Sequence, residues 1–217
     1  MNRIIVFALM FFCMTMQIEA QTLSEEEVTA KMYQAFELNK AAKKAEALEL
    51  FLIVGENTKQ QRNEGERQVY VCSQTMACQC YELLGRYKEG YLLGKSLLQG
   101  KLNDTERKDV GHLYAMNGYM YACEFIQRDE KGRADYKRGR ELISEILPYS
   151  DGQVKEYAET KIPLSWYFEG AQYAMTQSYD EALSSYEEAL NGFRDLGRVS
   201  EEVDVLSGIA SVKAHLC

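Results

Sequence analysis

Proline, histidine and basic residues are scarce in this chain. Only two of its 217 residues are proline and 15 are glycine, which excludes collagen-like chains and disordered chains rich in these two residues. Lysine and arginine number 25 against 33 acidic residues, so the chain lacks the basic surface typical of nucleic-acid binding. Apolar residues make up 46%, too many for a disordered acidic tail. Fifteen tyrosines beside so little proline favour long helices packed through aromatic rings.

The first twenty residues have the pattern of an export signal. Arg3 precedes a 13-residue apolar run, Ile4 to Met16, in which Thr15 is the one polar residue. The short segment Gln17-Ile18-Glu19-Ala20 follows, so the charged, apolar and small-residue parts of a secretory signal peptide occur in order. An uncleaved anchor is the alternative, although 13 residues fall short of the roughly 20 that span a bilayer. The sequence therefore predicts a signal peptide at 1–20, cleaved after Ala20, and an exported chain at 21–217 that is periplasmic or extracellular.

The cysteines favour neither a disulfide framework nor a metal site. The mature chain contains an odd number of them, whereas small secreted scaffolds usually have an even number: Cys72, Cys78, Cys80, Cys123 and Cys217. The first three fall on one predicted helix with no histidine near them in the sequence. We expect these three to be small buried side chains, and we expect no metal.

A repeated helical pattern is clearest at 166–190. Two successive helices are predicted there. Each contains three small or aromatic residues at spacings of four and three, which places the three on one face of that helix. The sets are Trp166, Gly170 and Tyr173, then Ala182, Tyr186 and Ala189. The segment 176–178 between them is short enough for a tight turn, so the two helices are predicted to pack against each other.

These six residues resemble the tetratricopeptide repeat (TPR) and stand in the register of its motif. Two positions depart from the motif, because Glu169 stands where it prefers leucine and Arg194 where it often has proline.

Fainter copies of the pattern occur upstream. Tyr114, Gly118 and Tyr121 repeat the first helix, and a second helix is expected at 136–147 after a turn lengthened by 128–133. Repeat starts are predicted near 28, 71, 111, 163 and 201. The resemblance implies an all-α fold, a right-handed α-solenoid of about four helix pairs plus an unpaired C-terminal helix. That helix is either an imperfect cap or a sign that the natural chain continues past Cys217, and self-association through it is a further expectation.

The sequence offers little that could carry catalysis. A glycine-rich stretch at 90–96 is similar to a phosphate-binding loop, but it has three residues between its glycines where the motif needs four. The predictions are therefore no enzyme and no cofactor, with an enzyme using an unrecognised site as the alternative.

The resemblance also implies where a partner binds. In TPR proteins the first helices of the pairs line a concave groove that commonly binds an extended peptide or a helix of another protein. The residues predicted to face this groove are Phe36, Thr75, Gln79, His112, Tyr119, Leu164 and Tyr167. Alternatively, further chain covers these rings. The predicted partner is a protein or peptide.

Two non-enzymatic roles remain open. An exported TPR chain is similar to the N-terminal repeat region of bacterial sensor and regulator proteins, which predicts the sensory or scaffold part of a larger signalling protein. The alternative is a free-standing periplasmic adaptor that assembles envelope proteins.

Overall fold

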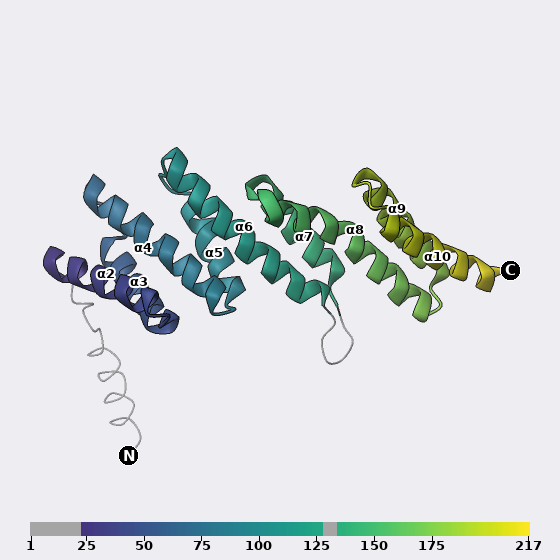
Figure 1. The fold of residues 1–217 in the computed structure, drawn as a ribbon, viewed down its shortest axis with the longest axis horizontal. Helices are drawn as coiled ribbons and strands as arrows, with labels where there is room; N and C mark the ends of the chain where they lie inside the picture. The colour runs from purple at the N-terminus through teal and green to yellow at the C-terminus, as the bar shows by residue number, and fades with distance from the viewer. Residues whose placement is uncertain (1–22, 128–133) are drawn as a thin grey trace, which may run out of the picture.

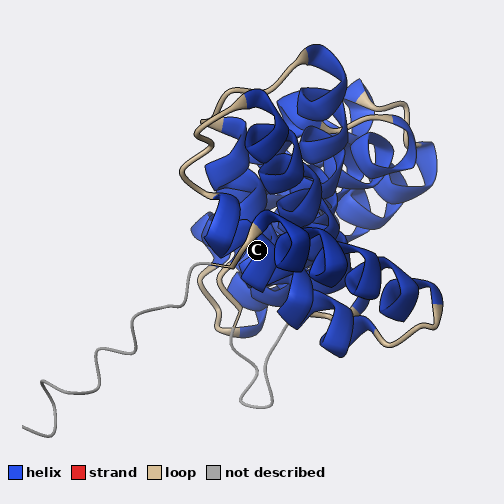
Figure 2. Ribbon diagram, turned by 90° about the vertical axis from the view of Figure 1, so that its left-hand side faces the viewer, coloured by secondary structure: helices blue, strands red, loops and turns tan. Residues whose placement is uncertain are grey.

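The computed structural model describes residues 23–127 and 134–217, and within these ranges all regular secondary structure is helical (Figures 1 and 2). Nine α-helices and one short 3-10 helix lie there. They are α2 (Glu25–Lys40), α3 (Lys44–Thr58), α4 (Glu64–Leu83), α5 (Tyr87–Leu98), α6 (Asp104–Ile126), α7 (Tyr136–Ile146), η1 (Leu147–Tyr149), α8 (Gly152–Met175), α9 (Tyr179–Asp195) and α10 (Val199–Leu216).

Consecutive helices pack as pairs. The pairs are α2 with α3, α4 with α5, α6 with α7, and α8 with α9, while α10 packs on α9 without a second helix of its own in the described ranges. Figure 1 shows the pairs stacked side by side into an elongated array, from the purple end to the yellow end. The protein is thus an all-α solenoid, and the predicted four pairs plus an unpaired helix are confirmed.

Four of the tight turns share one geometry. Ala42, Gly85, Gln177 and Gly197 have φ between 60 and 69°, in the left-handed region. At each turn the next residue donates its N–H to the carbonyl five positions back, at 2.9 Å. Such a turn ends one helix and reverses the chain within three residues. The turn predicted at 176–178 is one of these four.

Capping side chains begin the first helices of three pairs. Ser24 and Asn103 each accept a hydrogen bond from the backbone N–H three residues on, and the carboxylates of Glu27 and Glu106 in turn accept the backbone N–H of the cap residue. Asn63 accepts the N–H of Glu66 in the same way. These caps satisfy N–H groups that a helix start leaves without partners, so they fix where each new pair begins.

The apolar interior is a row of clusters instead of one central core. One cluster surrounds Phe51 between α2, α3 and α4, and a small one around Leu97 joins α4, α5 and α6. A third surrounds Ile143 and reaches from α5 to α8, and the last surrounds Tyr186 between α8, α9 and α10. Because neighbouring pairs share these clusters, each pair needs the next one to bury its apolar side chains.

Helix α8 corrects the predicted start of the fourth repeat. The helix begins at Gly152 and continues through Pro163, whereas the repeat was predicted to start near 163. Val154 and Ala158 in its first half pack in the cluster of the third pair, and the second half packs in the cluster around Tyr186. All five first helices begin earlier than the predicted repeat starts, because the motif residues lie inside each helix and not at its cap.

Two sequence-based predictions lie outside the described residues. These are the export signal at 1–20 and the lengthened turn at 128–133. Among the helices that the structure describes, none has the length and apolar character needed to cross a membrane.

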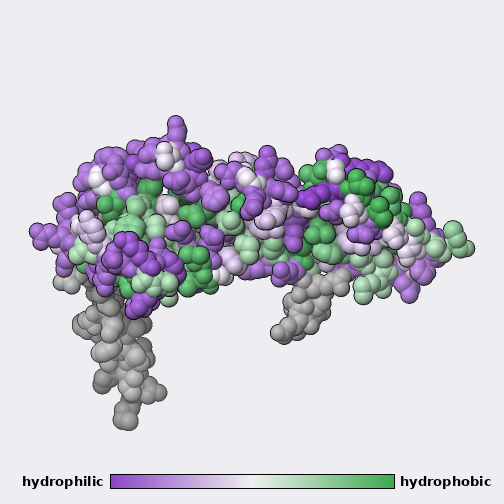
Figure 3. All heavy atoms as spheres, in the orientation of Figure 1, coloured by the Kyte–Doolittle hydropathy of each residue, from purple (hydrophilic) through white to green (hydrophobic). Residues whose placement is uncertain are grey.

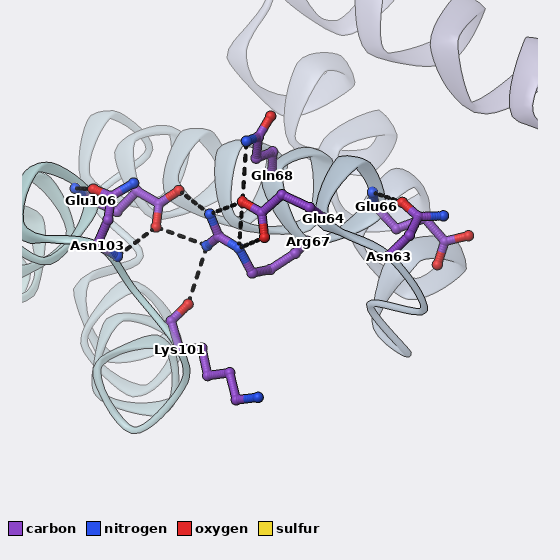
Figure 4. Close-up of polar contacts among 8 residues, drawn as sticks. All are labelled: Asn63, Glu64, Glu66, Arg67, Gln68, Lys101, Asn103 and Glu106. Atoms are coloured by element: carbon purple, nitrogen blue, oxygen red, sulfur yellow. Dashed lines mark hydrogen bonds and ion pairs between the residues drawn. The ribbon is translucent and has the colours of Figure 1, made fainter.

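Arg67 links the first helices of the second and third pairs (Figure 4). Its guanidinium donates to both carboxylate oxygens of Glu106, at 2.8 and 3.0 Å, and to Glu64 at 2.7 Å on its own helix. It also donates to the carbonyl of Lys101 in the loop before α6, at 3.2 Å. These contacts tie the start of α4 to the start of α6 at the point where one pair meets the next.

This link should make stability depend on pH. Hydrogen bonds from Arg67 hold the pKa of Glu64 and of Glu106 below the ordinary value of 4.5. Lowered folded-state pKa values contribute stability that is complete above that value and is lost as the pH falls through the folded values. We therefore expect Arg67→Met to lower the thermal midpoint at pH 7 more than at pH 3. Thermal denaturation of both chains across this range measures the difference in thermal midpoint, with Arg138→Met, which removes an exposed pair with Glu141, as the control. If Arg67→Met lowered the thermal midpoint equally at pH 7 and pH 3, the Arg67 ion pairs would not be the source of the pH dependence.

Candidate interaction surface

Two tyrosines from successive pairs form a shared aromatic surface. The Tyr119 ring of α6 stacks on the Tyr157 ring of α8, with centroids 6.3 Å apart and planes inclined by 27°. Tyr119 is half-buried, and burial raises the pKa of its hydroxyl, whereas Tyr157 remains 53% exposed. Both residues belong to first helices, so this surface bridges the junction between the third and fourth pairs.

An apolar stripe continues along α8 from Tyr157. Leu164, Phe168 and Met175 follow it at spacings of seven, four and seven residues, which places them on one face of the helix. Phe168 is 38% exposed and Met175 is 75% exposed, while Leu164 is half-buried. Figure 3 shows apolar residues interspersed with polar ones along the whole array on the face drawn. A row of exposed apolar side chains on one helix face is a candidate interaction surface.

The neighbouring part of the first-helix face is polar. His112 of α6 places its Nδ1 3.1 Å from the carboxylate of Asp151, just before α8. Glu82 of α4 is half-buried, and this burial raises the pKa of its carboxyl although the nearby His112 acts in the opposite direction. The face therefore changes from polar near α4 to aromatic and apolar along α8.

Three of the residues predicted to line a groove are accessible on this face. Gln79 and His112 are exposed, and Tyr119 is half-buried in the stack described above. Thr75 is half-buried, and its hydroxyl donates to the carbonyl of Val71, one turn back on its own helix.

The other predicted groove residues, Phe36, Leu164 and Tyr167, are half-buried and also contact side chains of neighbouring helices. Phe36 packs edge-on against Phe51 of α3, with ring centroids 5.5 Å apart. Tyr167 lies 5.8 Å from Tyr186 of α9, and Leu164 packs against the same cluster although it is part of the α8 stripe.

The residues of the predicted packing pattern in the third pair lie between α5, α6 and α7. Tyr114 stacks on Tyr91 at 5.3 Å, and Tyr121 lies 5.8 Å from the same ring. At Gly118 the space of a side chain is occupied by Ile146 of α7. In the fourth pair Ala182, Tyr186 and Ala189 are buried, and the Tyr186 ring lies against Gly170.

Trp166 and Tyr173 are only half-buried, because the junction with the third pair is polar. The Arg140 guanidinium of α7 lies 3.4 Å from the centroid of the Trp166 ring. The same guanidinium donates to Glu169 at 2.8 Å and to Ser165 at 3.3 Å. The glutamate that departs from the repeat motif is therefore the partner of a buried arginine, which sequence reasoning did not identify. A charged residue at a motif position for leucine was the available signal, since it requires an opposite charge nearby.

The cysteines and the glycine-rich stretch occupy packing positions, with one exception. Cys78, Cys80 and Cys123 are buried free thiols, and burial raises the pKa of Cys78 to about 12. Cys72 is exposed, which corrects its predicted burial, because it lies on the open side of α4.

Gly90 and Gly94, the glycines of the loop-like stretch, lie inside α5 and not in a loop. They allow Asn117 and Tyr114 of α6 to approach the α5 backbone closely. Within the described ranges no group of three or more His, Cys, Asp or Glu side chains could hold a metal ion.

No protein-family model matches the chain, and no curated protein sequence matches it. Solved structures that match include that of a putative kinesin light chain from Podosopora anserina with nearly identical TPR-like repeats. This chain is 15% identical to it, with a TM-score of 0.41, and the match covers 87% of this chain and 95% of that chain.

Proposed function

We propose that this protein is a non-enzymatic interaction module that binds a protein or peptide on the first-helix face of α6 and α8. The observation that carries the proposal is the Tyr119–Tyr157 stack, which continues into the exposed Phe168 and Met175 on one face of α8. Tyrosines and other aromatics are frequent anchors in interfaces, and a polar margin such as that around His112 limits the approach of wrong partners.

The double variant Tyr157→Ala/Phe168→Ala tests this surface. Tyr157 is 53% and Phe168 38% exposed, so their loss should weaken partner binding by about 100-fold while lowering the thermal midpoint only slightly. The partner is first captured by crosslinking in intact cells and is then titrated against the purified chain. The matched control is Leu92→Ala on α5, a residue that is 51% exposed on a second helix. Equal loss of binding in the control and the double variant, or no loss in either, would refute the surface.

The location and wider role belong to the same proposal. The sequence of residues 1–20 supports export with cleavage after Ala20, which N-terminal sequencing of the secreted chain tests. The TPR resemblance supports a sensory or scaffold part of a larger signalling protein in the periplasm. Reading the DNA downstream of codon 217 separates this role from that of a free-standing periplasmic adaptor, which predicts a stop codon there.

Self-association through the C-terminal helix is also part of the proposal. Helix α10 has no second helix of its own among the described residues, and apolar side chains remain exposed on it.

A further inference from the structure

A cavity opens where α7, α8 and α9 meet, at the junction between the third and fourth pairs. Its volume is about 330 Å³, at the small end of the range for small-molecule sites. Trp166 and Tyr173 of α8 form the aromatic part of its wall. Each stands two residues before a member of the exposed α8 stripe, about 200° around the helix. The cavity and the Tyr119–Tyr157 surface therefore lie on opposite sides of α8.

Ser185 of α9 provides an unused hydrogen-bonding group in this cavity. It is only 4% exposed and lines the cavity, yet its hydroxyl forms no hydrogen bond within the described ranges. The other buried serines and threonine, Ser73, Ser165 and Thr58, each donate to a backbone carbonyl of their own helix at 2.7 to 2.9 Å. A buried hydroxyl without a partner is unfavourable, so the Ser185 hydroxyl is available to a group that enters the cavity.

The buried ion pair of the junction also has unused hydrogen-bonding groups. Arg140 is 9% exposed and lines the cavity beside Glu169. Its guanidinium has five N–H donors, of which one bonds to Glu169 and one to Ser165, so three remain. Glu169 accepts through Oε2, and its Oε1 accepts no hydrogen bond among the described residues. A ligand in the cavity can therefore both accept from Arg140 and donate to Glu169.

Opposite charges stand at the mouth of the cavity on two different helices. Lys137 lies one turn before Arg140 on α7, and Glu181 lies one turn before Ser185 on α9, and both line the cavity. Both side chains are exposed, and neither forms an ion pair in the part of the chain that the structure describes. With the buried pair, the cavity has two cationic and two anionic side chains and no net charge. A ligand that carries one charge of each sign complements it.

We propose that this cavity binds a free α-amino acid with an apolar or aromatic side chain. The two cationic residues of α7 hold its carboxylate, the carboxylates of α8 and α9 hold its ammonium, and its side chain packs against the two aromatic rings of α8. An uncharged sugar of the same size would leave Lys137 and Glu181 unpaired. The assignment goes beyond the proposed function, because it gives the protein a small-molecule site that is separate from the partner surface.

Trp166 is the single tryptophan of the chain and lines the cavity, so its fluorescence reports binding directly. Free L-amino acids other than tryptophan and tyrosine are titrated one at a time into the purified chain. At least one with an apolar or aromatic side chain, such as leucine or phenylalanine, should change the emission until it saturates. Its N-acetyl derivative lacks the ammonium and its amide lacks the carboxylate, so each should bind about tenfold more weakly or worse.

Three results of this titration would overturn the proposal. They are the absence of a saturable change with every amino acid, equal binding of either derivative, and saturation by glucose but by no amino acid.

Two substitutions at the mouth of the cavity test the charges. Lys137→Met and Glu181→Gln should each raise the dissociation constant of that amino acid by about tenfold or more. Because both side chains are exposed, the thermal midpoint without ligand should hardly change. The matched controls, Lys88→Met on α5 and Glu187→Gln on α9, change exposed residues outside the cavity lining and should bind like the parent chain. Parent-like affinity in both cavity variants would overturn the proposal.

Discussion

Glu169→Leu is expected to destabilise the protein by about 3 kcal/mol, although it restores the residue that the repeat motif prefers at this position. Glu169 pairs with the Arg140 guanidinium at 2.8 Å, and the side chains of both residues are largely buried. Removing the carboxylate leaves the guanidinium buried with Ser165 and the Trp166 ring as its remaining partners. An uncompensated buried charge costs more than the added leucine gains. Chemical denaturation of both chains measures the difference.

The double variant Glu169→Leu/Arg140→Met is the control for this result. It removes both charges and places apolar side chains of similar length in the same junction. Buried ion pairs can often be replaced in this way without loss, so most of the lost stability should return. If Glu169→Leu alone stabilised the protein, the junction would be an ordinary apolar repeat contact and our explanation of the motif departure would be wrong.

Two glycines of one helix should respond oppositely to the same substitution. In Gly118→Ala the new Cβ would lie 2.5 Å from Cγ2 of Ile146 and 3.2 Å from the Tyr91 ring. A side chain branched at Cβ cannot easily move away, so we expect a loss of about 2 kcal/mol in unfolding free energy. In Gly111→Ala the nearest atom is on the Tyr149 ring at 3.4 Å, an ordinary contact. There the better helix propensity of alanine should add about 0.5–1 kcal/mol.

Denaturation of the two glycine variants beside the parent chain measures both effects. Both residues lie in α6, so alanine has the same helix propensity at each. Opposite signs of the change in unfolding free energy therefore report the difference in packing. Two stabilised variants would show that α6 does not approach α7 as closely as the structure places it.

The fold was predictable because its signal is local and repeated. Trp166, Gly170 and Tyr173 mark one face of a helix by spacing alone, and the same spacing at Ala182, Tyr186 and Ala189 marks the helix that packs on it. The tight turn between these two helices was predictable because only residues 176–178 separate them. The starts of the helices were less predictable, because the residues that cap them, such as Asn103, stand several positions before the first residue of the repeat motif.

The candidate surface was predicted less well, because it depends on contacts between pairs. Tyr167 is half-buried and its ring lies 5.8 Å from that of Tyr186, a contact that depends on the exact rotation of α8, because one residue on a helix turns a side chain by 100°. Tyr157 was missed because α8 begins before Pro163, the residue near which the repeat was predicted to start. The Arg140–Glu169 pair joins residues 29 positions apart, which spacing within one repeat does not reveal.

Site-specific photocrosslinking tests the central claim, that a partner binds the first-helix face. A benzoylphenylalanine is placed at Tyr157 in one chain and at Leu92 in another, since both residues are about half exposed and lie on first and second helices. Irradiation of intact cells should yield a partner adduct from position 157 and none from position 92. An adduct from position 92 without one from position 157 would contradict the claim.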